Sequence, residues 1–357
     1  MNKKLSPELR RILEAGNAAP SGENCQPWHF IVRENAIEVH LLPERDQSAY
    51  GWGQRGSYFA NGAAIENIVI AASVEHYRTE VQYLPNPQDE WHTATITLTK
   101  DSSVIPDSLA EHIHTRISNR KPYQKTPLTA QERSALVGAI NEPTNFVLKE
   151  DPIELEHLGR VGSTNEEIML ANRALHNFFF SHVTWTKEED EKNKIGFYIK
   201  TLELPPPAQA MFKVFKHWSI MRVLSALGFS RVIAKQNGVT NASASAIGAL
   251  MIDDTSPQSF LRAGRMVERV WLTATSLGLS FQPLTGVLFF KLKIEAGDAD
   301  HTFSAREEDT IMSAYAKAVE ILGAGQKHIS FMFRVGHGDA PSAHAIRFPL
   351  EEAVTIV

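Results

Sequence analysis

The hydrophobic residues near the start of the chain follow a helical period. Ile12 and Leu13 follow Leu9 by three and four residues, which places all three side chains on one face of a helix. Ser6 is a suitable N-cap and Pro7 suits the first turn, so we expect the helix to begin there. A run of small residues follows, which predicts that the helix ends in a loop.

Between residues 28 and 98 the pattern changes to short strand-like runs around one long apolar helix. The expected elements are strands over 28–32 and 37–42, a helix over 60–77, and strands over 79–84 and 93–98. The short polar connection between the first two strands predicts a hairpin. A boundary follows at about residues 102–110.

The second part of the chain contains more helical patterns. We expect helices over 129–140, 153–180 and 262–277, and strands over 246–252 and 331–335. Thr129 and Glu132 have the spacing of a capping box, which supports the first of these helices.

Residues 181–240 do not fit a regular core layer, because charged and aromatic stretches alternate there. We interpret about 181–235 as an insertion or lid. Outside it, apolar helices and strands occur in similar order in both parts, without a short repeat. This order predicts two related domains over 1–105 and 106–357.

The composition narrows the functional classes. The 357 residues are 43% hydrophobic and 22% charged, which is typical of a globular protein. The net charge of −5 gives no basic footprint, so a nucleic-acid partner is not expected. No apolar run suits a secretory signal or a membrane span. The single cysteine, Cys25, allows no intramolecular disulfide, and we expect a cytoplasmic protein.

The first motif with chemical potential is a loop of small and polar residues at 20–30. Small side chains let a flat ligand approach the backbone, and polar ones can contact the edge of a polar ring. Taken alone, the loop is more often an ordinary turn between a helix and a strand. The residues that we assign to a binding site here are Pro20, Ser21, Gly22, Asn24 and Gln26.

The second motif is a basic segment at 115–120. In an extended backbone Arg116, Ser118 and Arg120 would point the same way, since residues two apart share a face. Two guanidinium groups and a hydroxyl make a suitable receptor for a phosphate monoester. A solvated basic linker explains the segment equally well when it is taken alone.

Together the two motifs resemble those of the nitroreductase family of FMN-dependent proteins, in which two subunits share each flavin. Residues 20–30 match the family pattern Pro-Ser-x-x-Asn-x-Gln-Pro-Trp-x-Phe, and residues 116–120 match Arg-x-Ser-x-Lys/Arg. The resemblance implies an α+β fold with a mostly antiparallel sheet flanked by helices in each domain. It also implies FMN as the cofactor and NADH or NADPH as the electron donor.

Three later positions carry the resemblance further. Thr285 and Gly286 match the segment that passes flavin N5, where the family often has an acidic residue before the glycine. Arg347 matches the C-terminal phosphate segment, where the family often has Lys-x-Arg and this chain has Ala345 at the lysine position. By spacing from the strand at 246, Asn237 occupies the place of a flavin-contacting asparagine.

The order of the motifs is reversed relative to an ordinary family member. The phosphate motif follows the loop motif, and only residues 142–145 resemble a degenerate second copy of the loop. The two halves are therefore complementary. The resemblance implies a covalent pseudo-dimer with one FMN per chain, present as a monomer or as a homo-oligomer.

The resemblance implies reduction of small nitro or quinone-type acceptors by hydride transfer through flavin N5. Two alternatives stay open: an FMN oxidase or dehydrogenase for a biosynthetic intermediate, and a non-catalytic flavin-binding or storage protein. We assign no catalytic acid or base, since the flavin carries the redox chemistry. His112 and His114 have no further ligand at metal spacing, so no metal is expected.

Overall fold

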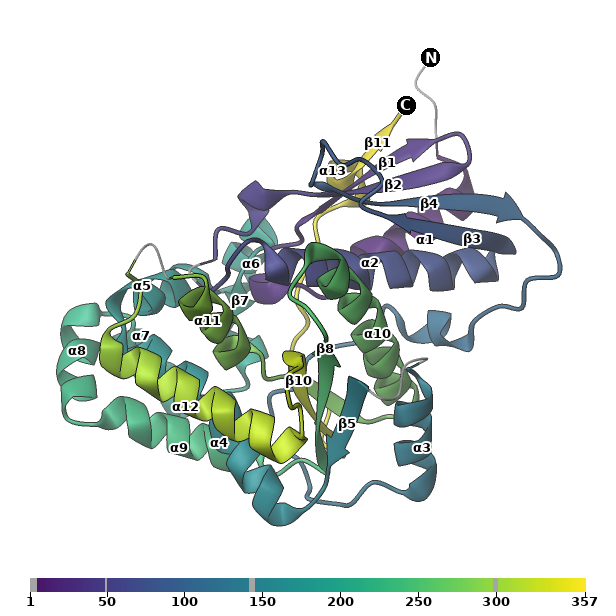
Figure 1. Cartoon of the computed structure of the whole chain (residues 1–357). Helices are drawn as coiled ribbons and strands as arrows, with labels where there is room; N and C mark the ends of the chain where they lie inside the picture. Colours follow the sequence, from purple (N-terminus) through teal and green to yellow (C-terminus); the bar gives the residue numbers. More distant parts are fainter. Residues whose placement is uncertain (1–4, 49, 141–144, 298–300) are drawn as a thin grey trace.

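The structure, a computed structural model, describes residues 5–48, 50–140, 145–297 and 301–357 (Figure 1). Two main sheets, each accompanied by helices, confirm the α+β class. Of the expected second loop copy, residues 142–144 lie outside the described residues. None of the described helices combines the length and apolar character needed to span a bilayer.

The first sheet is built mainly from the N-terminal part of the chain. Its strands, in spatial order, are β11 (Val354–Ile356), β1 (Trp28–Arg33), β2 (Ala36–Leu41), β4 (His92–Lys100) and β3 (Tyr77–Tyr83). All neighbours are antiparallel except β1 and β11, so the predicted hairpin of β1 and β2 is confirmed. Alternate residues of β1 and β2 are buried in a core shared with α1 (Pro7–Asn17) and α2 (Arg55–Val74).

The start of α1 is confirmed, because the Ser6 side chain accepts a hydrogen bond from the backbone of Leu9. The limits of α2 differ from the expected 60–77. The helix begins at Arg55, and it ends before His76, whose φ of 54° reverses the chain into β3. The expected start was late because polar residues hide the first turn.

The second sheet is entirely antiparallel. Its strands, in spatial order, are β5 (Phe146–Lys149), β8 (Ala246–Ile252), β10 (His328–Gly336) and β9 (Ser280–Pro283). Every residue of β8 is buried, which explains its continuous apolar pattern. The short strands β5 and β9 were not expected from the pattern.

Helices α2 and α10 (Pro257–Ser276) pack directly against each other and join the two sheets through one hydrophobic core. Their backbones touch at two glycines. A Cβ atom on Gly62 would lie 2.1 Å from the Leu261 carbonyl oxygen, and one on Gly264 would lie 2.0 Å from that of Phe59. Only glycine permits so close an approach.

The helical region expected over 153–180 is divided at Asn172 into α4 (Pro152–Ala171) and α5 (Arg173–Ser181). The Asn172 side chain caps α5. The following segment contains β6 (Val183–Thr184), α6 (Lys187–Asn193), β7 (Phe197–Tyr198), a 3-10 turn (Ile199–Leu202), α7 (Pro206–Phe215), α8 (Trp218–Ala226) and α9 (Phe229–Asn241).

The expectation that residues 181–240 join no regular layer is wrong for α9. This helix packs lengthwise on α4, and a Cβ atom on Gly159 would lie 2.6 Å from the Gly238 carbonyl oxygen. No apolar pattern marks the buried side of α9, because its buried positions are small or polar: Ser230, Ala234, Gly238 and Asn241.

The C-terminal part of the chain serves both sheets. Helices α11 (Gly286–Glu295) and α12 (Ala305–Leu322) share a second core with α4 and the second sheet. The chain then returns to the first sheet through α13 (Leu350–Ala353) and β11, so its C-terminal end lies beside β1 (Figure 1). Residues 350–356, assigned from the sequence to the second domain, thus complete the sheet of the first.

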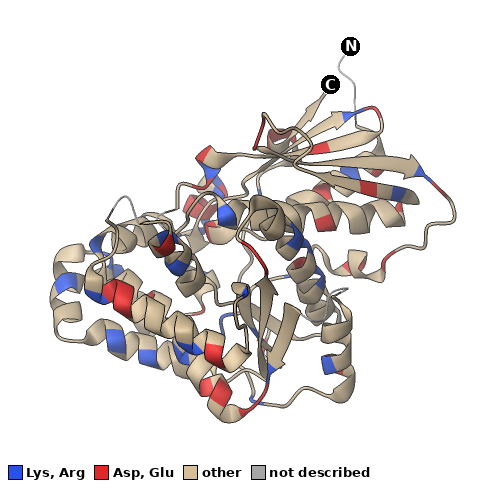
Figure 2. Ribbon diagram, in the orientation of Figure 1, with Lys and Arg blue, Asp and Glu red and all other residues tan. Residues whose placement is uncertain are grey.

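Residues 101–129, which include a 3-10 helix (Ser108–His112), and α3 (Ala130–Gly138) lie between the two sheets along the chain. The capping box of Thr129 and Glu132 is confirmed at the start of α3. Figure 2 shows acidic and basic residues interspersed along the helices of both halves.

Candidate functional site

The loop between α1 and β1 carries the first sequence motif on an unusual backbone. Glu23, Asn24 and Gln26 have φ values of 45°, 54° and 50°, in the left-handed region that is uncommon for residues other than glycine. The Ser21 hydroxyl accepts a hydrogen bond from the Gln26 backbone N–H, at 2.9 Å. Pro20 is half-buried beside them, and Gly22 is exposed. Contacts from elsewhere must therefore stabilise this loop.

The C-terminal segment supplies those contacts. The Asn24 amide donates to the Ile346 carbonyl oxygen at 2.7 Å, and the Gln26 side-chain oxygen accepts from the Phe348 backbone at 2.7 Å. Arg347 lies between these two anchors and donates to the Asn24 side-chain oxygen. The loop and the C-terminal segment, separated by more than 300 residues in the sequence, are thus one structural unit.

Two arginines meet at the end of α1. Arg116 donates to the Ala18 carbonyl oxygen at 2.8 Å, and Arg347 donates to the same oxygen at 3.4 Å and to that of Ala19 at 2.9 Å. Burial and the neighbouring positive charge of Arg116 lower the pKa of Arg347 to about 9. The structure therefore brings together two guanidinium groups that the motifs had placed far apart.

One buried carboxylate, that of Glu268, lies beside this pair of cations. Glu268 on α10 lies 3.0 Å from Arg116 Nε, and the two side chains are 0% and 3% exposed. Burial raises the pKa of Glu268, although the Arg116 charge opposes that rise. The Trp271 ring packs at 4.6 Å from the guanidinium carbon of Arg116. Glu268 was not predicted from the sequence, where its only signal is that it is the one acid within the helical pattern of 262–277.

The extended segment expected at 116–120 forms only in part. A turn ends at Arg116, whose backbone N–H donates to the His112 carbonyl oxygen at 2.9 Å. Ser118 then forms an isolated parallel bridge with β9. Arg120 donates to the Thr201 carbonyl oxygen at 2.9 Å, and burial lowers its pKa. The guanidinium groups of Arg116 and Arg120 thus have different partners.

Thr285 and Gly286 form the start of α11, against α4. A Cβ atom on Gly286 would lie 2.1 Å from the side-chain oxygen of Asn165, so the glycine is required. Asn165 Oδ1 and Glu166 Oε2 are buried and have no hydrogen-bond partner in the described part of the chain. Asn237 lies half-buried on α9, and no described hydrogen bond links it to the other predicted site residues.

Two further acids lie among these elements, and the sequence analysis assigned them no role. Burial, with a smaller contribution from Asp46, raises the pKa of Glu23 to about 8. Burial raises the pKa of Glu166 to about 7. Burial, with smaller contributions from the charges of both acids, raises the pKa of Tyr50, whose ring stacks on Phe290 with centroids 5.2 Å apart. The raised pKa of Glu23 favours its protonated form, which can donate a hydrogen bond.

The insertion contacts the loop directly. The Lys194 carbonyl oxygen accepts from Asn24 at 2.7 Å and from Gln26 at 2.8 Å, and the Gly196 backbone donates to the Glu23 carbonyl at 2.6 Å. Since Arg120 also donates to a carbonyl of the insertion, this segment covers both sequence motifs.

Comparison with known proteins gives a consistent set of relatives. The chain is 22% identical over 341 residues to an uncharacterized Mycobacterium tuberculosis protein, covering 94% of this chain and 46% of that protein. It is 24% identical over 288 residues to a protein of the same organism named as an NAD(P)H nitroreductase, covering 78% of this chain and 76% of the relative. The chain thus spans about half the length of the first relative.

A third similarity is to a Serratia protein named as the NAD(P)H nitroreductase PigM, with 19% identity over 295 residues, covering 80% of this chain and 82% of that one. No family model matches the chain.

Proposed function

We propose that this chain, which belongs to the nitroreductase family, is a flavin-dependent oxidoreductase that binds one FMN between its two halves. The observation that carries the proposal is the meeting of Arg116 and Arg347 at the Ala18 carbonyl, directly before the loop at 20–26. Three distant parts of the chain converge there, and they are the parts that resemble the family motifs.

The charges at this point suit a phosphate group. Arg116 and Arg347 carry two positive charges against the single carboxylate of Glu268. Arg347 Nε is buried and has no hydrogen-bond partner among the described residues. A phosphate monoester would accept from such guanidinium groups and remove the excess positive charge. Arg116, Ser118 and Arg347 are the residues that would hold it.

The residues around Gly286 suit the polar ring of a flavin. Asn165 and Glu166 have buried oxygens without partners, and Gly286 keeps the backbone close to them. Arg120 of the basic segment lies close enough for its charge to oppose the rise that burial causes in the pKa of Glu166. FMN, when bound, would supply the redox chemistry. The chain would orient the ring, and the covering insertion would exclude water.

The reaction that we propose is the reduction of a small nitro or quinone-type acceptor, with NADH or NADPH as electron donor. One observation favours a second candidate, a flavin-binding or storage protein without turnover. The insertion accepts hydrogen bonds from both motifs at Lys194 and Thr201, which would restrict the entry of a second substrate. Both candidates share the same flavin site.

Binding of FMN to the purified protein tests the site. We expect one FMN per chain, because a single chain supplies both half-sites. Arg347→Met should weaken FMN binding by about 1.5–3 kcal/mol, as expected for loss of a charge-assisted hydrogen bond. Arg133→Met is the matched control, since Arg133 pairs with Glu150 at the surface of α3. Titration followed by flavin fluorescence gives both affinities.

Two flavins per chain, or unchanged affinity in Arg347→Met, would contradict the proposed site. Anaerobic addition of NADH or NADPH to the flavin-loaded protein separates the two functions. Rapid bleaching of the flavin supports the reductase. A bound flavin that neither nucleotide reduces supports the storage protein.

A further inference from the structure

Three histidines form a row on the first sheet, on the side opposite its buried core. His29 on β1 is the cross-strand partner of His40 on β2, and His40 is in turn the partner of His92 on β4. The residues beside them on β2, Val39 and Leu41, point into the core. The row lies outside all residues that we assign to the flavin, so the inference below does not rest on the proposed function.

A β-bulge places His92 in this row. Val39 pairs with Ala94, but the next residue, His40, pairs with His92 and not with Thr93. Thr93 is buried, and its hydroxyl donates to the Val39 carbonyl oxygen at 2.8 Å. In a regular strand His92 would point into the core, since side chains alternate between faces. Bulges often re-aim a side chain in this way beside a functional site.

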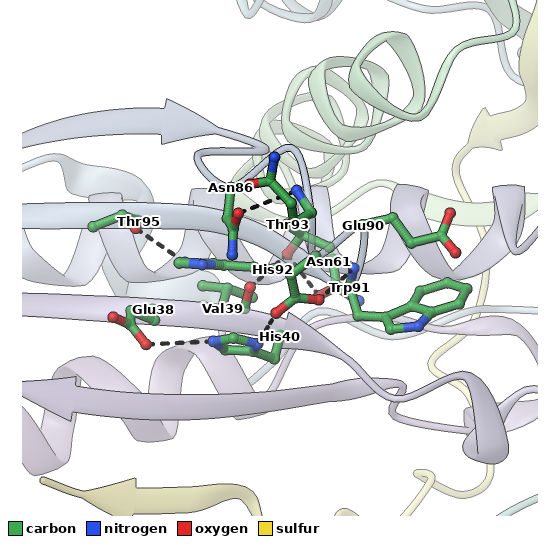
Figure 3. Close-up of polar contacts among 12 residues, drawn as sticks. Glu38, Val39, His40, Asn61, Asn86, Glu90, Trp91, His92, Thr93 and Thr95 are labelled. Carbon is green, nitrogen blue, oxygen red and sulfur yellow. Dashed lines mark hydrogen bonds and ion pairs between the residues drawn. The ribbon is translucent and has the colours of Figure 1, made fainter.

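The bulge completes a compact set of potential metal ligands, shown in Figure 3. Glu38, His40 and His92 each offer one possible ligand atom, and these three atoms all lie within 4.8 Å of one another. His40 Nε2 and Glu38 Oε2 are 3.4 Å apart, and the two imidazole rings stack with centroids 4.4 Å apart. Ligand atoms of a tetrahedral zinc ion with bonds of about 2.0–2.1 Å lie roughly 3.3 Å apart, so small side-chain rotations suffice.

Neighbouring polar groups hold these three side chains in place. Arg33 Nε lies 2.6 Å from the other Glu38 oxygen, Oε1. Asp89 Oδ2 lies 4.0 Å from His40 Nδ1, the ring nitrogen that does not face Glu38. The Thr95 hydroxyl lies 3.0 Å from His92 Nε2. Carboxylates and hydroxyls behind the ligands are typical of metal sites, because they fix the orientation of the rings.

We propose that Glu38, His40 and His92 bind one divalent transition-metal ion, for which Zn²⁺ is the most suitable probe. Two imidazoles and one carboxylate are ligands that zinc accepts, and three protein ligands leave one position for water. All three side chains are half-buried, which limits competition from solvent without closing access.

Zinc titration of the full-length protein without a histidine tag tests this site, with a chromophoric chelator as competitor. We expect one Zn²⁺ per chain, and Co²⁺ in the same site should show the stronger visible absorption of a four-coordinate ion. His40→Gln and His92→Gln should each lower the affinity at least about tenfold. Asp89→Asn should lower it about tenfold through His40, as loss of an outer partner commonly does.

His29→Gln is the matched control, because His29 belongs to the same row but its Nε2 contacts Thr355 Oγ1 at 2.9 Å. This variant should keep the wild-type zinc affinity. Far-UV circular dichroism tests whether each variant is folded. If a histidine variant does not fold, Glu38→Gln takes its place in the zinc titration and should lower the affinity in the same way. Unchanged zinc binding in His40→Gln and His92→Gln would overturn the proposal, as would an equal loss in His29→Gln.

Discussion

Replacement of Arg116 is the sharpest test of how the two halves are joined. In Arg116→Met the Glu268 carboxylate stays fully buried and loses the cation 3.0 Å away. Breaking such a pair costs about 3–5 kcal/mol, because an uncompensated charge stays in a medium of low polarity. The lost hydrogen bond to the Ala18 carbonyl adds to this effect. We therefore expect a loss of unfolding free energy of at least about 3 kcal/mol.

The double variant Arg116→Met/Glu268→Leu removes both charges and should recover most of the loss, since well-packed apolar residues often replace buried ion pairs without cost. Urea denaturation of the flavin-free proteins, followed by circular dichroism, measures the difference. Arg133→Met, at an exposed pair, should change stability by under about 1 kcal/mol. A double variant as unstable as the single one would refute the reasoning. FMN affinity is then best compared in the double variant, where weak binding no longer reflects partial unfolding.

Two other predictions concern the core and the buried acid of the loop. Gly264→Ala places a methyl group against the Phe59 carbonyl and should lower the free energy of unfolding by at least about 2 kcal/mol, because it forces α2 and α10 apart. Gly138→Ala on α3 is the control: a Cβ atom there would have no neighbour within 4 Å, so the denaturation midpoint should stay unchanged or rise. Because the pKa of Glu23 is about 8 in the folded protein against 4.5 without its surroundings, the folded state binds more protons between these values. Stability of the flavin-free protein should therefore fall as pH rises from about 4.5 to 8, and Glu23→Gln should flatten that fall; an unchanged pH profile would contradict the burial of this acid.

Local signals in the sequence predicted local structure well. Ser6 and Thr129 cap helices because their partners lie three residues away, so the sequence shows the whole interaction. The β1–β2 hairpin follows for the same reason. The short strands β5 and β9 were missed because four residues carry too little periodic signal to stand out.

The candidate site was predictable only where its residues form a motif. Asn24, Gln26 and Arg347 were identified from their neighbours in the sequence, and the structure brings them together. Glu268 and Glu166 were not, because the residues next to an acid in a helix give no sign of its partner on another element. Their importance comes from burial, which depends on how α4 and α10 pack.

By itself, the sequence determined the two motifs, their reversed order and the capped starts of α1 and α3, since each depends on residues close together in the chain. Only the tertiary structure decided which charges meet. It paired Arg116 with Glu268 through the packing of α10, and it returned residues 350–356 to the first sheet. It also turned His92 onto the face of His40, because a bulge in one strand is set by hydrogen bonds to the next.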